Sequence, residues 1–206
     1  MTHRTAGWYR VLELSGVYEL CQRALGGRAA RDRFVREFVR PEPGVRILDV
    51  GCGAGSLLDH LPRSVEYVGY DLNPRYIAAA RERYGDRGRF FQARVGDPLP
   101  LEHGAFDLVI AKAILHHLDD QEADQLIATA RLQLRPGGAL VTIDPVFHES
   151  QSLVARALIS RDRGRSVRTP EGYRQLVTAH FESLEDHLLT DQLIVPYSHF
   201  VQRALR

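Results

Sequence analysis

The chain has 206 residues, of which 44% are hydrophobic, enough for one domain with its own core and too few for a second large domain. Its formal net charge of +1 gives no overall field that attracts nucleic acid, so we expect an enzyme acting on a small molecule. The two cysteines, Cys21 and Cys52, form no C-x-x-C pair and predict neither a disulfide scaffold nor a metal site.

Charged residues interrupt the apolar residues at the start of the chain, and no run approaches the ~20 apolar residues of a membrane span. We therefore expect a cytoplasmic protein without a signal peptide or a membrane segment. We also expect a monomer or a homodimer. Lys112 is the only lysine, and its presence alone indicates no function.

Two helical patterns open the chain, over residues 8–25 and 28–39. Gly26 and Gly27 separate them, and prolines end the second pattern. They predict an N-terminal helical layer or lid over residues 1–44, ahead of a single main domain over residues 45–206.

Residues 45–50 form a short apolar run that predicts a buried strand of a parallel sheet. The run leads directly into Gly51, Gly53 and Gly55, which allow a sharp turn and a close approach of the backbone to a ligand. The first N–H groups of the following helix have no partners within that helix, so the turn predicts a site for a nucleotide-like cofactor. Ser56 stands where a dinucleotide fingerprint has glycine or alanine, which argues against a nicotinamide-dependent oxidoreductase.

Strand and helix patterns alternate after this turn, as expected for an α/β fold with helices on both faces of a parallel sheet. Asn73 is a suitable helix cap and Pro74 a suitable first helical residue, which places Asp71 at the end of a strand. We expect helices at 56–61, 74–84, 121–134, 150–159 and from 170, and strands at 65–71, 88–95, 107–110, 139–143, 181–189 and 194–201.

Four segments, in order, carry a family resemblance: LDVGCGAG at 48–55, VEYVGYD at 65–71, FDLVI with LHHL at 106–118, and LRPGGALV at 134–141. Together they resemble the motifs of class I S-adenosylmethionine-dependent methyltransferases. The resemblance implies a doubly wound, seven-stranded, mostly parallel sheet with a C-terminal antiparallel hairpin. It also implies S-adenosylmethionine as cofactor and methyl transfer to an oxygen or nitrogen of a small molecule, such as a secondary metabolite.

The resemblance assigns cofactor roles to specific residues. Gly51, Gly53 and Gly55 would cradle the methionine part, and Asp49 would orient its ammonium group. At the other end of the cofactor, Asp71 would accept the ribose hydroxyls, and Leu72 would lie against the adenine.

Two further assignments leave alternatives open. Family members often place an acid for the adenine amino group after the third strand, and Asp97 fits this role only if the loop is shifted; it equally suits a residue that satisfies its own turn. Tyr18 and Gln22 lie one turn apart on the first helix, and they fit either ordinary packing or closure over the cofactor's carboxylate.

Methyl transfer needs alignment of the reactants and, for some acceptors, removal of a proton. The resemblance favours His117 as the catalytic base, with His116, Asp144, His148 and His199 as further candidates. The run of Arg161, Arg163, Arg165 and Arg168 fits either an acidic acceptor or a solvated loop. A protein that binds S-adenosylmethionine without transferring its methyl group is the alternative function.

Overall fold

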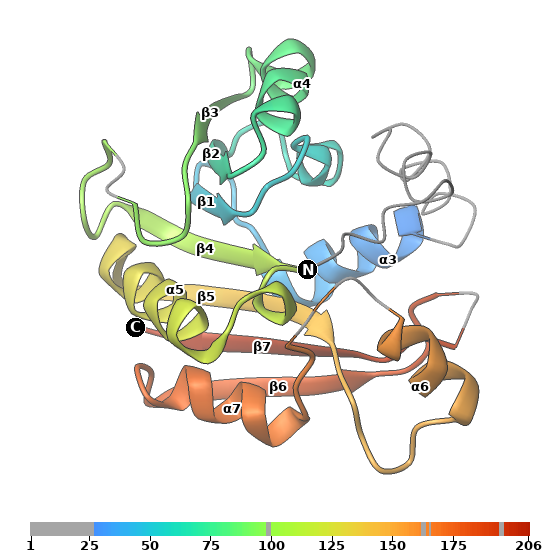
Figure 1. Ribbon diagram of the computed structural model, residues 1–206. Helices are drawn as coiled ribbons and strands as arrows, with labels where there is room; N and C mark the ends of the chain where they lie inside the picture. Colours follow the sequence, from blue (N-terminus) through green and yellow to red (C-terminus); the bar gives the residue numbers. More distant parts are fainter. Residues whose placement is uncertain (1–26, 98–99, 162–163, 165, 194–195) are drawn as a thin grey trace, which may run out of the picture.

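The computed structural model describes residues 27–206, apart from 98–99, 162–163, 165 and 194–195. The predicted first helix and Tyr18 therefore lie outside the described residues. A seven-stranded sheet forms the centre of the molecule, in the order β3-β2-β1-β4-β5-β7-β6 (Figure 1). Its strands are β1 (Arg46–Val50), β2 (Glu66–Asp71), β3 (Gly88–Gln92), β4 (Phe106–Lys112), β5 (Leu134–Pro145), β6 (Ser183–Leu189) and β7 (His199–Leu205).

The pairing of the strands confirms the predicted fold class. Strands β1 to β5 pair in parallel, whereas β7 pairs antiparallel with both β5 and β6. The chain order of strands reverses between β1 and β4, so the carboxyl ends of these two strands border a crevice where α/β proteins bind ligands.

Helices cover both faces of the sheet (Figure 1). One face packs against α3 (Gly27–Phe34), the π-helical turn η1 (Val35–Val39), the 3₁₀ turn η2 (Ser56–His60) and α4 (Pro74–Tyr84). The other face packs against α5 (Asp120–Gln133) and α7 (Pro170–Thr178). The short 3₁₀ turn η3 (Leu115–His117) follows β4, and α6 (Leu153–Ser160) lies beyond the carboxyl end of β5.

Local sequence signals explain where the helices begin. The side chain of Asn73 accepts a hydrogen bond from the backbone N–H of Arg75, as predicted for a cap before Pro74. Helix α5 begins with a capping box between Asp119 and Glu122. The caps hold the helix starts at the edge of the sheet where strands β1, β2 and β4 end.

Several predicted boundaries differ from those of the structure. The last strand was expected at 194–201 but is His199–Leu205, because Pro196 has no N–H for a ladder and the strand pairs along β5 with Phe200 and Ala204 facing one core cluster. The segment 56–61 is a 3₁₀ turn rather than an α-helix, and 28–39 ends as a π-helical turn. The strand expected at 88–95 ends at Gln92.

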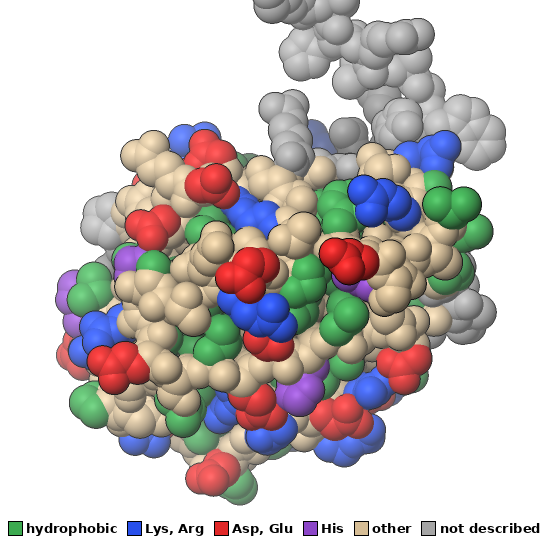
Figure 2. All heavy atoms as spheres, turned by 90° about the horizontal axis from the view of Figure 1, so that it is seen from below, with side chains coloured by type: hydrophobic (Ala, Val, Ile, Leu, Met, Phe, Trp, Pro, Cys, Tyr) green, Lys and Arg blue, Asp and Glu red, His purple; other side chains and the backbone are tan. Residues whose placement is uncertain are grey.

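The face of the molecule shown in Figure 2 carries acidic and basic side chains close to one another, with hydrophobic groups between them. None of the helices in the described part of the chain is long and apolar enough to cross a membrane.

Candidate active site

The glycine turn lies at the end of β1 and leaves open space beside its middle residue. Gly51, Gly53 and Gly55 have φ angles of +70°, +55° and +76°, a region that side chains disfavour. A Cβ on Gly51 would lie 2.7 Å from Cδ1 of Ile114, whereas a Cβ on Gly53 would meet no atom of the described residues within 4 Å. Gly51 therefore packs against Ile114, whereas the space beside Gly53 would allow a ligand to approach the backbone closely.

Asp71 is fixed beside this turn by two backbone donors. Its Oδ2 accepts a hydrogen bond from the N–H of Gly53 at 3.0 Å, and its Oδ1 accepts one from the N–H of Asn73 at 2.8 Å. Each carboxylate oxygen keeps further acceptor capacity. The carboxylate is therefore held in place at the end of β2, where the sequence placed it, and its role toward a ribose diol stays a prediction. The neighbouring Leu72 is 55% exposed.

Asp49 is buried beneath the glycine turn. The hydroxyl of Tyr67 donates to its Oδ2 at 2.5 Å. Burial raises the pKa of Asp49 to about 7, and the charge of Asp71 adds to this shift, whereas the Tyr67 hydrogen bond and the charge of Lys112 oppose it. The role of Asp49 toward the ammonium group of the cofactor stays a prediction.

Asp97 satisfies its own turn in this structure. Its Oδ2 accepts a hydrogen bond from the N–H of Arg94 at 2.7 Å. The contact supports the simpler of the two interpretations, although it leaves the role toward adenine as a prediction.

A buried imidazole–carboxylate pair lies at the ends of β4 and β5. Nδ1 of His116 is 2.6 Å from Oδ1 of Asp144, and the backbone N–H of His116 donates to the same oxygen at 3.1 Å. Both side chains are at most 3% exposed. Burial raises the pKa of Asp144, while its hydrogen bond to His116 and the charges of His116 and Lys112 oppose the shift.

His117, the predicted base, differs from its neighbour in its surroundings. It is exposed, and its ring lies against that of His116 with 4.0 Å between the centroids. The other candidate histidines have structural contacts: Nε2 of His148 is 3.0 Å from Oγ of Ser198, and the ring of His199 lies 5.0 Å from that of Tyr197.

The last residue of β4 and the residue that follows it are both unusual. Lys112 is partly buried, and burial together with the charge of Arg31 lowers its pKa to about 8, against the opposing carboxylates of Asp49 and Asp144. Ala113 has a φ of +55°, and its N–H donates to the carbonyl of Ile143 at 2.8 Å. Backbone strain of this kind is concentrated at functional sites, because the surrounding structure must hold it.

The described members of the arginine run have structural roles. Arg168 donates to the backbone carbonyls of Leu115 and Leu118, pairs with Asp120, and has a side chain only 10% exposed. Arg161 donates to the carbonyl of Ala157 within its own helix. Arg163 and Arg165 lie outside the described residues. Arg168 thus supports the turn η3, in which His116 lies.

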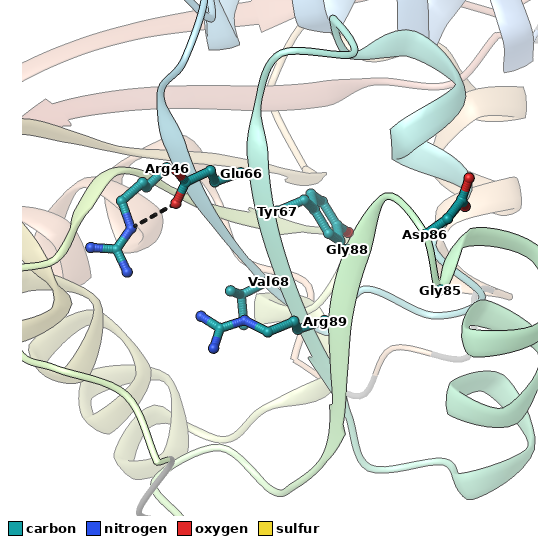
Figure 3. A pocket seen from close by; sticks show the side chains of 8 residues that line it. All are labelled: Arg46, Glu66, Tyr67, Val68, Gly85, Asp86, Gly88 and Arg89. Atoms are coloured by element: carbon teal, nitrogen blue, oxygen red, sulfur yellow. Dashed lines mark ion pairs between the residues drawn. The ribbon is translucent and has the colours of Figure 1, made fainter.

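The described surface has hollows at opposite ends of the strands. One, of about 310 Å³, is lined by Arg46, Glu66, Arg89 and their neighbours at the amino ends of β1, β2 and β3, the edge opposite to the glycine turn (Figure 3). Its distance from the glycine turn argues against a role in cofactor binding. The other, of about 410 Å³, lies along α6 and is lined by Phe147, Leu153, Arg156, Ala157 and Ser160. Because it adjoins the segment after Asp144, it is the better candidate for an acceptor site.

Sequence reasoning assigned roles to His117 and the glycine turn but missed the pairing of His116 with Asp144 and the place of Lys112. The doubled histidine was the available signal, yet only the turn η3 decides which of the two rings points inward. Within the described residues, no group of three or more histidine, cysteine or acidic side chains could hold a metal ion.

The comparisons with known proteins agree with this geometry. Residues 47–138 match a family model described as a methyltransferase domain. An O-methyltransferase of Pyrenophora dematioidea is 32% identical over 155 residues, which cover 67% of this chain and 57% of that protein. A ubiquinone biosynthesis O-methyltransferase of Roseobacter denitrificans is 36% identical over 113 residues, or 52% of this chain and 45% of that protein.

The fold comparison extends further along the chain. The structure of phosphoethanolamine N-methyltransferase 2 of Haemonchus contortus in complex with S-adenosyl-L-methionine superposes with a TM-score of 0.72 and 17% identity, covering 88% of this chain and 53% of that one. The chain thus spans about half the length of these three proteins.

Strand order, glycine turn and family match together define the class: the chain contains a methyltransferase domain with the class I, Rossmann-like fold. The roles of Gly53 and Asp71 toward S-adenosylmethionine stay predictions.

Proposed function

We propose that the protein transfers a methyl group from S-adenosylmethionine to a hydroxyl oxygen of a small molecule, and that His116, held by Asp144, removes the hydroxyl proton. The observation that carries this proposal is the 2.6 Å contact between His116 Nδ1 and Asp144 Oδ1 at the carboxyl edge of the sheet. An oxygen acceptor needs such a base more than an amine does, because a neutral hydroxyl is a weak nucleophile.

The pair has the arrangement that a general base requires. When His116 is neutral, its Nδ1–H donates to Asp144, and the proton of the acceptor goes to Nε2. The carboxylate fixes this tautomer and the orientation of the ring, and it stabilises the imidazolium that forms. Burial of both side chains keeps the ring in one orientation.

In this proposal, the remaining residues bind the cofactor and align it with the acceptor. S-adenosylmethionine, when bound, supplies a methyl group on a positively charged sulfur. Gly53 and Asp71 would hold its two ends, and Asp49 would attract its cationic methionine part. Alignment of the acceptor oxygen with the methyl group contributes much of the rate in a displacement of this kind.

The hollow along α6 supports an acceptor with apolar or aromatic character. Phe147 is one of its lining residues, with the guanidinium of Arg156 5.3 Å from the ring centroid. Leu153 and Val154 on α6 are 85% and 59% exposed. An exposed apolar helix beside the ends of the strands suits a flat organic acceptor better than a highly charged one.

Transfer of a labelled methyl group from S-adenosylmethionine into a panel of phenols, alcohols and amines tests the function. We expect label in hydroxyl acceptors, with the preference lost when the hydroxyl is replaced by hydrogen. Label in no acceptor, together with tight cofactor binding, would support the alternative of a protein that binds the cofactor without methyl transfer.

Matched histidine variants test the base. His116→Gln and Asp144→Asn should lower kcat/KM by about 10²- to 10⁴-fold while S-adenosylhomocysteine affinity, measured by calorimetry, stays near that of the wild type. His117→Gln is the control, because it changes the adjacent, exposed ring. If His117→Gln loses activity and His116→Gln keeps it, the base is His117, as the sequence alone predicted.

A further inference from the structure

The imidazole of His116 is enclosed by segments from different parts of the chain. Asp144 of β5 contacts its Nδ1 at 2.6 Å, and the ring of His117 lies beside it. The segment that follows α6 also covers it, because Gly164 lies against the ring and the N–H of Ser166 donates to the carbonyl of His116 at 2.9 Å. The position of this ring is therefore set by packing as well as by its hydrogen bond.

Gly164 approaches His116 so closely that no side chain fits between them. A Cβ on Gly164 would lie 2.2 Å from Cδ2 of His116, 2.8 Å from its carbonyl oxygen and 3.0 Å from its Cγ. Carbon atoms in ordinary contact lie about 3.5–4.0 Å apart, so all three positions are too close for a side-chain carbon. Glycine is the residue that allows a backbone to approach another group in this way.

The contacts with Asp144 and Gly164 hold the imidazole at both ring atoms that are bonded to Cγ. Nδ1 faces Asp144, and Cδ2 faces Gly164. The torsion of histidine about its Cβ–Cγ bond has broad energy minima and does not fix the ring by itself. Because both atoms move when the ring turns about this bond, contacts on both restrict the rotation. Cδ2 is also bonded to Nε2, the atom proposed to take the proton of the acceptor.

The segment that carries Gly164 also carries the candidate acceptor hollow. The N–H of Phe147, after β5, donates to the carbonyl of Arg168 at 3.1 Å, so the two ends of this segment lie together. Helix α6 lies between these ends in the sequence, and its residues line the hollow. A contact between this segment and His116 therefore connects the candidate acceptor site with the proposed base.

We propose that Gly164 is a positioning residue, whose backbone packs directly on the imidazole of His116 and holds it against Asp144. This inference rests on the proposed function, in which His116 is the base. It adds that the segment after α6 sets the direction in which Nε2 points. The direction matters because a displacement of about 1 Å at a reacting group can cost about 10²-fold in rate.

Gly164→Ala should displace the imidazole, because the new Cβ overlaps the ring and either the ring or the segment must move. We expect kcat to fall by about 10- to 100-fold, while the affinity for S-adenosylhomocysteine stays near that of the wild type. Gly172→Ala is the control, since a Cβ there would come no closer than 3.3 Å to any atom of the described residues. Its kcat should stay near that of the wild type.

NMR spectroscopy tests the contact without turnover. In the wild type, a nuclear Overhauser effect should join the Hα protons of Gly164 to Hδ2 of His116. The Nδ1 proton of His116 should exchange slowly with water, because Asp144 accepts it within a buried pair. In Gly164→Ala the signal of this proton should broaden or disappear through faster exchange, and in Gly172→Ala it should persist.

A double-mutant cycle covers the case in which Gly164→Ala folds poorly. His116→Ala removes the ring that the new Cβ overlaps, so Gly164→Ala should lower the denaturant midpoint less in the His116→Ala background than in the wild type. An equal loss in both backgrounds overturns the proposal. So does the absence of the Overhauser effect, or an Nδ1 proton signal that is unchanged in Gly164→Ala.

The two proposals fail separately, because neither the NMR signals nor the cycle depends on turnover. If these results are as expected while His116→Gln keeps full activity, the base role of His116 fails, and Gly164 still positions the imidazole. If activity depends on His116 but Gly164→Ala keeps the kcat of the wild type, only the role of Gly164 fails.

Discussion

The glycines of the turn differ in their surroundings. Gly51 faces Ile114 of the segment after β4, whereas no atom of the described residues would lie within 4 Å of a Cβ on Gly53. Both have positive φ angles, so any side chain costs backbone strain at either position. We therefore expect Gly51 to matter for packing of the protein and Gly53 to matter for binding of the cofactor.

A pair of alanine substitutions tests this separation. Gly51→Ala should lower the free energy of unfolding by about 2–4 kcal/mol, because the new Cβ overlaps Ile114 and adds to the strain. Gly53→Ala should cost only about 1–2 kcal/mol but should weaken S-adenosylhomocysteine binding at least tenfold. Denaturant unfolding and calorimetry measure the two effects, and equal stability losses would contradict the assignment.

Asp71 tests the other end of the same site. Asp71→Ala should weaken cofactor binding by about 10- to 100-fold, because it removes the proposed acceptor for the ribose hydroxyls and the partner of the Gly53 N–H. Calorimetry with S-adenosylhomocysteine measures the loss. Asp97→Ala is the comparison, and it should have the smaller effect if Asp97 serves only its own turn. Unchanged affinity in Asp71→Ala would refute the cofactor role of this carboxylate.

Asp49 should make stability depend on pH. Its pKa in the folded state is raised to about 7, so the folded state binds more protons than the unfolded state between pH 4 and pH 7, and its contribution to stability falls as the pH rises through this range. Asp49→Asn lacks this term. The unfolding free energy of the variant minus that of the wild type should therefore rise from pH 4 to pH 7 and stay constant at higher pH. Denaturant unfolding at several pH values checks the trend, and a constant difference would exclude it.

At the scale of elements, the turn η3 determines which histidine faces inward. Arg168 donates to the carbonyls at both ends of this turn, and Ser166 donates its N–H to the carbonyl of His116. Segments about 50 residues apart in the sequence thus hold the catalytic candidate in place. The last-turn carbonyls of such a short element have few other donors.

The arginine run offers a matched test of this support. Arg168→Gln should lower the free energy of unfolding by about 1–3 kcal/mol, since it leaves partly buried carbonyls without their donor, and it should reduce kcat by displacing His116. Arg161→Gln, which changes an exposed arginine of the same run, should alter neither by much. If both variants instead raise KM for an acidic acceptor without loss of stability, the run serves acceptor binding.

At the scale of the whole molecule, the parallel sheet assembles the site. The ends of β1, β2, β4 and β5 bring Asp49, Asp71, Lys112 and Asp144 to one edge, although nearly a hundred residues separate the first from the last. Each of these strands supplies only one charged residue to this edge. The site therefore exists only when the sheet is complete, and cofactor binding should be coupled to global stability.

A ligand panel tests that coupling. S-adenosylmethionine and S-adenosylhomocysteine should raise the melting temperature in a concentration-dependent way, because binding at about 100 times Kd contributes about 2.7 kcal/mol to the folded state. NAD should have no effect, since the turn lacks the dinucleotide fingerprint. Stabilisation by NAD alone would contradict the cofactor assignment.

Much of the fold followed from local patterns. The apolar run before the glycines, the cap at Asn73 and the alternation of elements predicted five parallel strands, the helices between them and the carboxyl-edge site. These signals are short-range, so the sequence carries them directly. The last strand was misplaced because its register depends on pairing with β5, a partner distant in the sequence.

The candidate site divides in the same way. The amino-acid sequence alone determined the glycine turn and Asp71, because backbone conformation and strand ends depend on neighbouring residues. Only the tertiary structure decided that His116 rather than His117 contacts Asp144, and that burial lowers the pKa of Lys112. Contacts of this kind depend on the direction of side chains across paired strands and on burial, and both are set by the packing of segments far apart in the chain.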